Sequence, residues 1–474
     1  MTEKLQLRGY QSDCLDWSID QFARKNKKGV LLDLDCGLGK TVISLSAMQI
    51  LKVVGISPWL VVAPLRVAKL VWPDEIESWS DYSDLKYSIV HGTKKKREAA
   101  LEKDADVYII NYEGLPWLHS TGWRKARGLV LDESTYVKSW KAKRTKALKS
   151  MLPDFKKRIL LSATPMANCR SELFAQAFFM DDGETLGKTI GSFRRKYMMP
   201  GGYLGRGWIM RPDASKEVDA RMAPSVYRLD AESNLDMPEL IDNKVSIELP
   251  ANLKKDYDQL EQEMFLELES GDPLLAESGG SKYSACRQFS SGAIYHTDED
   301  TGEKSVVHLH DEKINTLKEL DEAIPTPILV LYHFRHSRER IERAFPDCEV
   351  IAGGVKTEDV RGIIQRWQAG ETKMLAAQIK AVGHGVDGLQ KGEGGHDIVL
   401  FDQTDSGDLD TQSIGRIYRS GQDSNYVRIH RLVCKDTVDE MIYRSIKSKL
   451  KGQAAFDAAM KEYRESKAYS GSAK

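Results

Sequence analysis

The chain has 474 residues, of which 41% are hydrophobic and 29% are charged, and its 69 Lys and Arg residues nearly balance its 70 Asp and Glu residues. At roughly 100–200 residues per domain, this length predicts two large domains or three smaller ones, and the composition argues against wholesale disorder. The net charge of −1 excludes a globally basic nucleic-acid binder, but it leaves room for a local basic groove.

Signals for export, membrane insertion and disulfide formation are missing from the sequence. The N-terminal MTEKLQLRGYQ has no apolar signal core, and no apolar run reaches the roughly 18 residues of a membrane span. The six cysteines are scattered without a CxxC pair, which argues against a zinc module or a disulfide framework. We therefore expect a cytoplasmic protein.

Short apolar runs alternate with helical patterns in both halves of the chain. This alternation is typical of buried parallel strands in βαβ units. The first half carries such runs at residues 29–34, 60–63, 107–110, 129–131 and 158–161. The second half carries them at residues 328–333, 349–352, 373–379, 397–401 and 427–433. The pattern predicts an α/β fold with two tandem parallel-sheet domains.

A polar middle region, residues 183–325, interrupts this rhythm. It contains a predicted helix over Ala251–Leu268 and a predicted turn between two strands at His296–Lys304. We interpret the region as small insertions on the two domains. The expected domains are residues 1–245, with an insertion at about 185–235, and residues 246–474, with an insertion at about 250–310 and a helical tail after 450.

The first predicted strand runs into the sequence CGLGKT and then into an apolar helical pattern. A strand, a tight glycine loop and a helix start form a phosphate cradle of backbone N–H groups. Gly37 and Gly39 let the backbone approach the anion, Lys40 would reach the β- and γ-phosphates, and Thr41 would ligate Mg²⁺. The strict GxxxxGKT pattern is not met, because Leu34 occupies its first glycine position. A glycine turn followed by an exposed lysine is the alternative interpretation.

An acidic pair, Asp132 and Glu133, follows the apolar run at 129–131. Ligands of parallel sheets lie at this end of the strands. Asp132 would hold Mg²⁺, and Glu133 would polarise the attacking water. An ordinary polar strand end is the alternative, but the order of a GKT loop, two further strands and an acidic pair favours the catalytic interpretation.

Two arginines, Arg416 and Arg419, lie three residues apart in QSIGRIYRSGQ. On a helix, this spacing places both guanidinium groups on one face. Arginine fingers supplied from a second domain accelerate nucleotide hydrolysis by roughly 10³–10⁵ where they are known. The alternative is a pair of surface arginines on a solvated helix.

Together, these motifs resemble those of superfamily 2 helicases and, within them, the Swi/Snf-like DNA translocases in their compact bacterial or phage form. The matches run in the family's order from residue 5 to residue 433. They are LRGYQ (7–11), CGLGKT (36–41), VVAPLRVAKLVWPDE (61–75), NYE (111–113), DEST (132–135), LSATPMAN (161–168), PILVLYHF (327–334), GVDGL (385–389) and QSIGRIYRSGQ (412–422). The sequence departs from the family where DEST lacks the usual His, where Thr404 lacks a Trp, and where His384 and Asp387 stand in motif V.

The resemblance implies two RecA-like domains, the cofactors ATP and Mg²⁺, and a set of nucleotide contacts. Ser162 and Thr164 would couple the nucleotide state to the domain interface. The implied nucleotide-binding residues are Arg8, Gln11, Gly37, Leu38, Gly39, Lys40, Thr41, Gly385, Asp387 and Gln412.

The resemblance also implies DNA bound across both domains, and basic segments supply candidate contacts. Six basic residues lie between Lys138 and Lys149, where counterion release would favour phosphate binding, although a solvated basic helix face is an equal alternative. Arg66 and Lys69 are better placed, in motif Ia. The predicted contact residues are Arg66, Lys69, Asn111, Lys138, Lys141 and Arg144. Binding to duplex or branched DNA would be largely independent of sequence.

The resemblance therefore implies a monomeric ATP-dependent motor that is stimulated by double-stranded DNA and moves along it. A strand-separating DNA or RNA helicase and a non-enzymatic, nucleotide-gated DNA-binding scaffold are the alternatives. The sequence leaves open the biological process, the polarity of movement and any protein partner.

Overall fold

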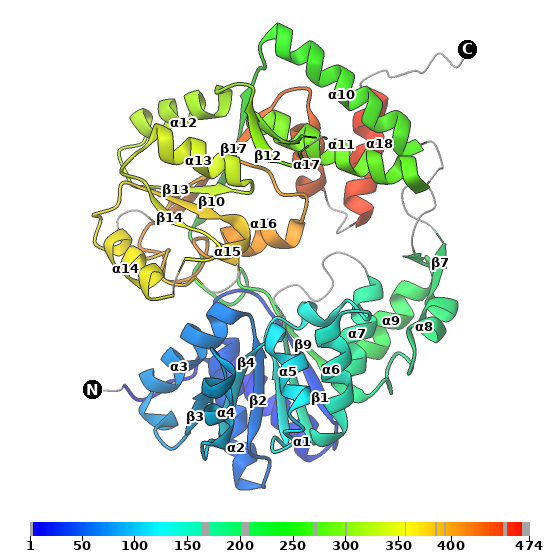
Figure 1. Ribbon diagram of the computed structural model, residues 1–474. Helices are drawn as coiled ribbons and strands as arrows, with labels where there is room; N and C mark the ends of the chain where they lie inside the picture. Colours follow the sequence, from blue (N-terminus) through cyan, green and yellow to red (C-terminus); the bar gives the residue numbers. More distant parts are fainter. Residues whose placement is uncertain are drawn as a thin grey trace. The chain divides into compact units, whose positions relative to one another are not determined.

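The computed structural model of the chain describes residues 3–162, 170–200, 208–269, 273–298, 301–355, 357–383, 386–392, 395–448 and 453–466. Two predicted site residues, Thr164 and Gly385, lie outside these ranges. Nearly all described residues up to Asp236 form one compact unit, and nearly all from Met237 onward form a second (Figure 1). Each unit is described by itself.

The first unit is built on a seven-stranded sheet in which all neighbouring strands are parallel. The strand order is β3-β4-β2-β5-β6-β1-β9. The strands are β1 (Gly29–Leu34), β2 (Trp59–Ala63), β3 (Tyr87–Ile89), β4 (Val107–Asn111), β5 (Gly128–Leu131), β6 (Lys157–Ser162) and β9 (Val226–Leu229). Its helices include α1 (Gly9–Ala23), α2 (Lys40–Val53), α3 (Trp72–Ser78), α4 (Lys94–Glu102), α5 (Leu115–Ser120), α6 (Lys143–Met151) and α7 (Arg170–Asp181).

The five strands predicted in the first half are confirmed. They lie inside the sheet, where helices cover both faces, and for this reason their sequences are continuous apolar runs. Every residue of β1, β2 and β5 is buried. The two edge strands of the sheet, β3 and β9, were not predicted from the sequence. β3 has three residues, and β9 is only partly buried, so neither shows a continuous apolar run.

A small antiparallel hairpin between two helices decorates the first unit. It comprises α8 (Ile190–Tyr197), β7 (Met198–Pro200), β8 (Trp208–Met210) and α9 (Ala214–Met222). The predicted insertion at 185–235 is therefore too long at its C-terminal end. Residues from Val226 onward return to the main sheet, where β9 pairs with β1.

The second unit is built on a six-stranded parallel sheet in the order β10-β17-β16-β13-β15-β14. The strands are β10 (Glu239–Ile247), β13 (Ile328–Tyr332), β14 (Glu349–Ile351), β15 (Met374–Gln378), β16 (Asp397–Leu400) and β17 (Tyr426–Cys434). All five predicted strands of this half are confirmed, and the predicted α/β class with two parallel sheets is correct.

The predicted boundary between residues 245 and 246 is corrected by β10, which starts before it and belongs to the second unit. β10 pairs with β17 along its whole length, from Glu239 opposite Tyr426 to Ile247 opposite Cys434. The division therefore falls between Asp236 and Met237. β10 is a largely exposed edge strand of mixed polar and apolar residues, so its sequence gives no buried-strand signal.

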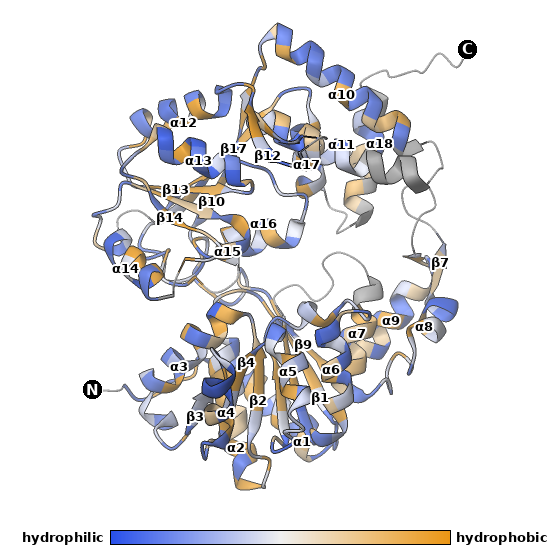
Figure 2. Ribbon diagram, in the orientation of Figure 1, coloured by the Kyte–Doolittle hydropathy of each residue, from blue (hydrophilic) through white to orange (hydrophobic). Residues whose placement is uncertain are grey.

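An added helical layer and a second hairpin complete this unit. Helix α10 (Ala251–Glu269) confirms the predicted helix, and β11 (Ala293–Thr297) pairs with β12 (Lys304–His308) around the predicted turn. The remaining helices are α11 (Pro273–Ser291), α12 (Glu312–Ala323), α13 (Arg335–Ala344), α14 (Thr357–Gln368), α15 (Ile379–Gly383), α16 (Gly407–Ile414), α17 (Val438–Lys447) and α18 (Gln453–Ser466). Helices α10, α11, α17 and α18 share one apolar cluster, and Figure 2 shows α17 and α18 with both hydrophilic and hydrophobic residues.

Asp402 ties the second unit together after β16. Its buried carboxylate accepts hydrogen bonds from Ser291 Oγ (2.6 Å), Ser337 Oγ (3.2 Å) and the backbone N–H groups of His333 (2.8 Å) and Phe334 (3.1 Å). These donors belong to α11, α13 and the segment between β13 and α13. One buried carboxylate thus fixes three segments of the unit. Among the described helices, none has the length and apolar character needed to cross a membrane.

Candidate ATP-hydrolysis site

The predicted catalytic segments of the first unit meet at one edge of its sheet. In a parallel sheet, the carboxyl ends of all strands lie at the same edge. The phosphate loop follows β1, Ser162 ends β6, and the acidic pair follows β5; these three strands are neighbours in the order β5-β6-β1. Ser162 lies opposite Asp33 of β1 in the register. The sheet therefore brings together residues that are far apart in the sequence.

The phosphate loop has the backbone conformation that its glycines allow. Gly37 and Gly39 have φ angles of 89° and 78°, in the left-handed region that favours glycine. Helix α2 begins at Lys40, so its first N–H groups face the loop. The Lys40 ammonium donates to the backbone carbonyls of Leu34 (2.6 Å) and Asp35 (3.1 Å). A cation and a helix N-terminus at one glycine loop form an anion site.

The adenine motif touches this loop directly. The Gln11 side chain accepts from the Arg8 backbone N–H (2.9 Å) and donates through Nε2 to the Leu38 carbonyl (3.3 Å). A Cβ atom at Gly39 would collide with Gln11 Nε2. Gly39 is favoured there by its left-handed φ of 78°, and the Gln11 side chain fills the space that a Cβ would take and joins the start of α1 to the phosphate loop.

The acidic pair is held by hydrogen bonds with three groups, from Trp72, Thr135 and Val62. Trp72 Nε1 donates to Asp132 Oδ2 (2.8 Å), and Thr135 Oγ1 donates to Glu133 Oε1 (2.7 Å). The Asp132 N–H donates to the Val62 carbonyl (2.8 Å), so the pair stays attached to β2. Glu133 itself has φ 59°, a left-handed conformation that is uncommon outside glycine. Such strain persists where surrounding contacts enforce it, and it is concentrated at functional sites.

Tyr112 supports the acidic pair through its backbone carbonyls. Its hydroxyl donates to the backbone carbonyls of Asp132 (2.9 Å) and Glu133 (3.2 Å), and its ring stacks on Tyr136 at 4.9 Å. Burial, together with the nearby Asp132 and Glu133 charges, holds the pKa of Tyr112 well above its usual value. The phenol therefore remains a hydrogen-bond donor across the physiological pH range.

Three of these supporting roles were not predicted from the sequence. Trp72, predicted only as part of the motif at residues 61–75, is fully buried and donates to Asp132. Tyr112 was predicted only as part of the NYE motif, and Thr135 only as a departure from the family's His. All three belong to motifs, but the targets of Trp72 and Tyr112 depend on the tertiary fold.

The residues at this edge suit magnesium. Thr41 supplies a hydroxyl at the second position of α2, and Asp132 supplies a carboxylate at the end of β5. Hard oxygen donors of this kind, completed by phosphate oxygens and waters, are what Mg²⁺ prefers. No group of three or more His, Cys, Asp or Glu residues that would form an all-protein metal cage occurs among the described residues.

The predicted helix across both arginines is wrong. Helix α16 ends at Ile414 with Gly415 as its C-cap, so Arg416 and Arg419 lie in the turn that follows. Glycine weakens a helix by about 1 kcal/mol relative to alanine, which favours an end at this position. Arg416 Nη2 donates to the Gly383 carbonyl (2.8 Å), and Arg419 Nη1 pairs with Asp387 Oδ1 at 2.5 Å.

Asp387 and Gln412, both predicted nucleotide contacts, lie with these arginines in the second unit. Desolvation by neighbouring chain raises the pKa of Asp387, whose side chain is still 54% exposed, but the charges of Arg419 and Arg416 outweigh this effect and hold that pKa below its usual value. Gln412 is buried beside Gly383, which also accepts from Arg416. The structure thus gathers three predicted residues, Gln412, Arg416 and Asp387, around the end of α15.

The candidate nucleic-acid contacts of the first unit are spread over several elements. Lys138 and Lys141 are exposed before α6, while Arg144 is half-buried and donates to the Tyr136 carbonyl (2.9 Å). Asn111 ends β4 and donates to Glu113 (2.9 Å). These residues do not form one helix face, because α6 starts only at Lys143.

Arg66 and Lys69 lie in or beside a short π-helical turn, Val67–Val71, that leads into α3. Burial lowers the pKa of Arg66 from its usual value. Single π-helical turns are rare and occur frequently at functional sites. The same segment continues to Trp72, the donor to Asp132. A short stretch of chain therefore links predicted DNA contacts with the acidic pair.

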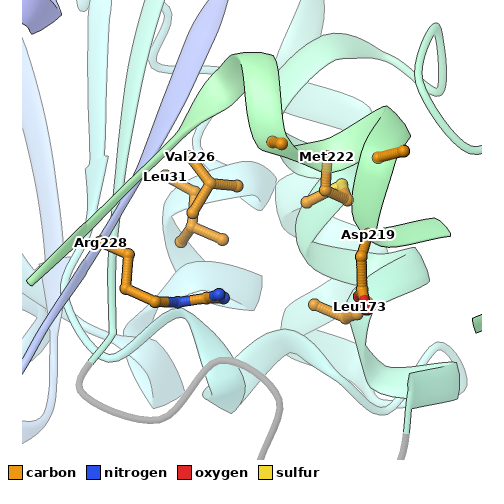
Figure 3. A pocket seen from close by; sticks show the side chains of 8 residues that line it. Leu31, Leu173, Asp219, Met222, Val226 and Arg228 are labelled. Carbon is orange, nitrogen blue, oxygen red and sulfur yellow. The ribbon is translucent and has the colours of Figure 1, made fainter. Parts of the chain in front are cut away.

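A pocket of about 440 Å³ lies beside β1 in the first unit (Figure 3). Its lining is mainly apolar and includes Leu31, Leu173, Met222 and Val226. Arg228 also lines it and donates through Nε to Asp33 Oδ2 (2.5 Å). Burial raises the pKa of Asp33 despite this ion pair. The pocket borders the strand that carries the phosphate loop, but it is separate from the loop residues.

The fold and the site together define a nucleotide-hydrolase architecture, and comparisons with known proteins narrow the class. The family model described as SNF2-related domain matches residues 10–224. Protein p41 of Acyrthosiphon pisum secondary endosymbiont phage 1 is 33% identical over 444 residues, which cover 90% of this chain and 93% of p41. YwqA of Bacillus subtilis (strain 168), named as a candidate ATP-dependent helicase/translocase, is 25% identical over 94% of this chain and 48% of its own length.

A solved structure, the Sulfolobus solfataricus SWI2/SNF2 ATPase core in complex with dsDNA, is 22% identical with a TM-score of 0.45, covering 98% of this chain and 96% of that one. The chain spans nearly all of the phage protein but less than half of YwqA. The chain belongs to the Swi/Snf-like family of superfamily 2. It therefore carries the helicase-like ATPase core of this family, with two RecA-like units.

Proposed function

We propose that this protein hydrolyses ATP when it binds double-stranded DNA and uses the energy to translocate along the duplex. The observation that carries the proposal is the single sheet edge shared by the phosphate loop, Ser162 and the acidic pair. Membership in the family and the name of YwqA support ATP-driven movement. Stimulation by DNA and translocation along it go beyond family membership, and each is tested separately below.

In this proposal, the predicted site residues of the first unit divide the binding and chemical steps among them. Lys40 and the α2 N-terminus bind the phosphates, and Gln11 and Arg8 hold the adenine side of ATP. Thr41 and Asp132 hold Mg²⁺, which supplies charge neutralisation at the phosphates when it is bound. Glu133, oriented by Thr135, accepts a proton from the attacking water.

The second unit would complete the reaction. Arg416 and Arg419 stabilise the charge that develops on the transferred phosphoryl group, and Gln412 and Asp387 complete the nucleotide contacts. Because Arg419 is paired with Asp387, it has to exchange this partner for phosphate. Ser162 and Thr164 pass the nucleotide state to the unit boundary. Such exchange of partners between two states is a common device of nucleotide-driven switches.

DNA would bind the first unit through Arg66, Lys69, Asn111, Lys138, Lys141 and Arg144, with phosphates rather than bases as targets. A phosphate-based interface predicts binding that is independent of sequence and falls steeply with salt. We place the motor in the cytoplasm of a bacterial or phage-infected cell, in accordance with its phage relative. We expect it to act as a monomer.

The test is ATP hydrolysis with and without duplex DNA. We expect Lys40→Ala and Glu133→Gln to reduce DNA-stimulated turnover at least 100-fold, because they remove phosphate binding and the general base, which alone contributes about 10²–10⁴. Near-normal turnover in either variant would contradict the assigned roles. An ATP hydrolysis rate that no nucleic acid increases would contradict DNA stimulation. Complete absence of ATP hydrolysis in the wild type would favour a nucleotide-gated scaffold.

Translocation needs a second measurement, displacement of a triplex-forming strand from duplex DNA. We expect the wild type to displace it only with ATP and Mg²⁺. Unwinding of a labelled duplex in the same conditions would support the alternative, a strand-separating helicase.

A further inference from the structure

The hairpin β7–β8 of the first unit exposes apolar side chains. Met199 is 36% exposed, Trp208 is 38% exposed and Ile209 is 37% exposed. Met199 and Ile209 face each other across the two strands, as do Pro200 and Trp208. Figure 1 shows β7 beside α8 and α9. A single two-stranded ribbon with exposed apolar residues has little intrinsic stability in water.

The other register pair explains what anchors the hairpin. Met198 is buried in the main apolar cluster of the unit, and its partner Met210 packs against the same cluster. The Arg211 guanidinium donates to the carbonyls of Met198 (3.2 Å) and Arg195 (3.1 Å). The base of the hairpin is therefore fixed, and alternation of side chains directs Met199 and Ile209 away from the core.

The surroundings of the hairpin are basic. The described residues 188–200 and 208–222 contain seven Lys and Arg residues against three Asp and Glu residues, whereas the whole chain has a net charge of −1. Arg194 lies over the Trp208 ring at 5.3 Å from its centroid. Glu217 is shared by Lys196 (3.1 Å) and Arg221 (2.9 Å), while Arg195 is exposed and has no acidic partner in the part of the chain that the structure describes.

We propose that the hairpin β7–β8, with the basic last turn of α8, is a contact site for unpaired DNA bases and their phosphates. Trp208 offers a stacking surface backed by the Arg194 guanidinium, whereas Met199 and Ile209 lie on the opposite face of the two-stranded ribbon. Arg195 supplies a phosphate contact beside it. Positive charge next to exposed apolar side chains fits a single strand, in which bases and phosphates are both accessible.

A protein surface suits this hairpin less well. The cores of protein–protein interfaces are depleted in charged residues, whereas this apolar surface is bordered by an excess of cations. Stacked bases within an intact duplex do not offer their faces to Trp208, so the site selects unpaired DNA at a fork or gap. This inference rests on the proposed function, because it gives the DNA motor a second contact that duplex translocation does not require.

The experiment measures binding of the full chain to a labelled oligothymidylate by fluorescence anisotropy, and duplex-stimulated ATP hydrolysis in parallel. We expect Trp208→Ala to weaken oligothymidylate binding roughly tenfold, since base–aromatic stacking is worth about 1–3 kcal/mol per base. Ile209→Ala, on the opposite face of the ribbon, should leave it nearly unchanged, and Arg195→Ala should reduce its salt dependence. Duplex-stimulated hydrolysis should stay within about twofold of the wild-type value.

Ile50→Ala is a second control outside the hairpin, because Ile50 is an exposed apolar residue on α2 of the same unit, 43% exposed against 38% for Trp208. Thermal unfolding of each variant checks that the fold is intact. Unchanged oligothymidylate binding by a folded Trp208→Ala variant would overturn the site. A change only in sedimentation would assign the hairpin to an interface between copies of the chain and would overturn it equally.

Failure of the proposed function has a different signature. If duplex DNA does not stimulate ATP hydrolysis by the wild type, the proposed duplex-DNA motor is contradicted. This conclusion does not depend on the results for the hairpin variants. Loss of oligothymidylate binding in Trp208→Ala with normal duplex stimulation confirms the hairpin site alone. The two proposals can therefore fail separately.

Discussion

Thr135 directly follows the acidic pair and Ser134, and its hydroxyl donates to Glu133 Oε1 (2.7 Å). Glu133 has a left-handed backbone and a single described side-chain donor, so its carboxylate position depends strongly on this bond. Glu133 is two residues away from its donor, so this orienting contact forms within one short segment.

We predict that Thr135→Val lowers kcat for ATP hydrolysis roughly threefold to tenfold, a fraction of the full contribution of a general base. The KM for ATP should change little, because valine has a similar shape and Lys40 still binds the phosphates. Thr135→Ser, which keeps the hydroxyl, should restore most of the rate. Equal rates for the valine and serine variants would show that this bond has no role in turnover.

Two buried histidines near α12 and α13 are expected to make the folding stability of the second unit sensitive to acid. His310, before α12, and His336, in α13, are both buried, and burial lowers the pKa of each to about 4. Asp402, Arg340 and His308 face His336, and Arg340, Lys313 and Asp311 face His310. His336 lies between the rings of Phe334 and Tyr295, and neither of its ring nitrogens has a partner among the described residues.

These shifts fix the sign of the pH dependence. Between about pH 6.5 and about pH 4, the unfolded chain binds protons at these histidines and the folded unit does not, so stability falls as the pH falls. We expect a loss on the order of a few kcal/mol across this range. Urea unfolding at several pH values measures it.

His336→Leu should weaken this acid sensitivity and leave stability near neutral pH unchanged or slightly higher, because it removes two buried nitrogens. Asp347→Asn is a suitable control, since Asp347 is exposed in the same unit. A pH profile of the leucine variant parallel to that of the wild type would contradict the role of His336.

The division of the whole molecule depends on one long-range strand pair. β10 contributes Asp242, which accepts from Arg431 Nε (2.9 Å) and pairs with Lys447 (2.7 Å). Arg431 is 2% exposed and also forms two hydrogen bonds with Asp410 (2.8 and 2.9 Å). Removing β10 would leave a buried guanidinium with half of its partners. Breaking a buried ion pair in this way costs about 3–5 kcal/mol.

We predict that residues 237–474 fold as an isolated fragment and that residues 246–474 do not. The shorter fragment lacks most of β10 and all of Asp242, so it should be sensitive to protease and lack a cooperative urea transition. Fragment 1–236 should fold by itself as well, because its sheet is complete at β9. Equal stability of fragments 237–474 and 246–474 would place the boundary elsewhere.

The sequence alone was sufficient for the central strands, the order of the motifs and the family. Strands such as β1 and β13 are buried on both faces, so their apolar runs are visible locally, and Lys40 and Asp132 follow such strands directly. The roles of Arg8, Lys40, Asp132 and the arginine pair remain predictions, although the structure brings the first three to one unit and Arg416 and Arg419 to one turn.

Only the tertiary structure decided where edge strands, helix ends and supporting hydrogen bonds lie. β9 and β10 carry mixed sequences because one side of an edge strand faces solvent, and their membership depends on partners nearly two hundred residues away in the chain. The end of α16 before Arg416 and the donation from Trp72 to Asp132 depend on neighbours in space rather than in sequence. The near-neutral net charge can be read from the sequence, whereas the placement of Arg194 over the Trp208 ring exists only in the folded chain.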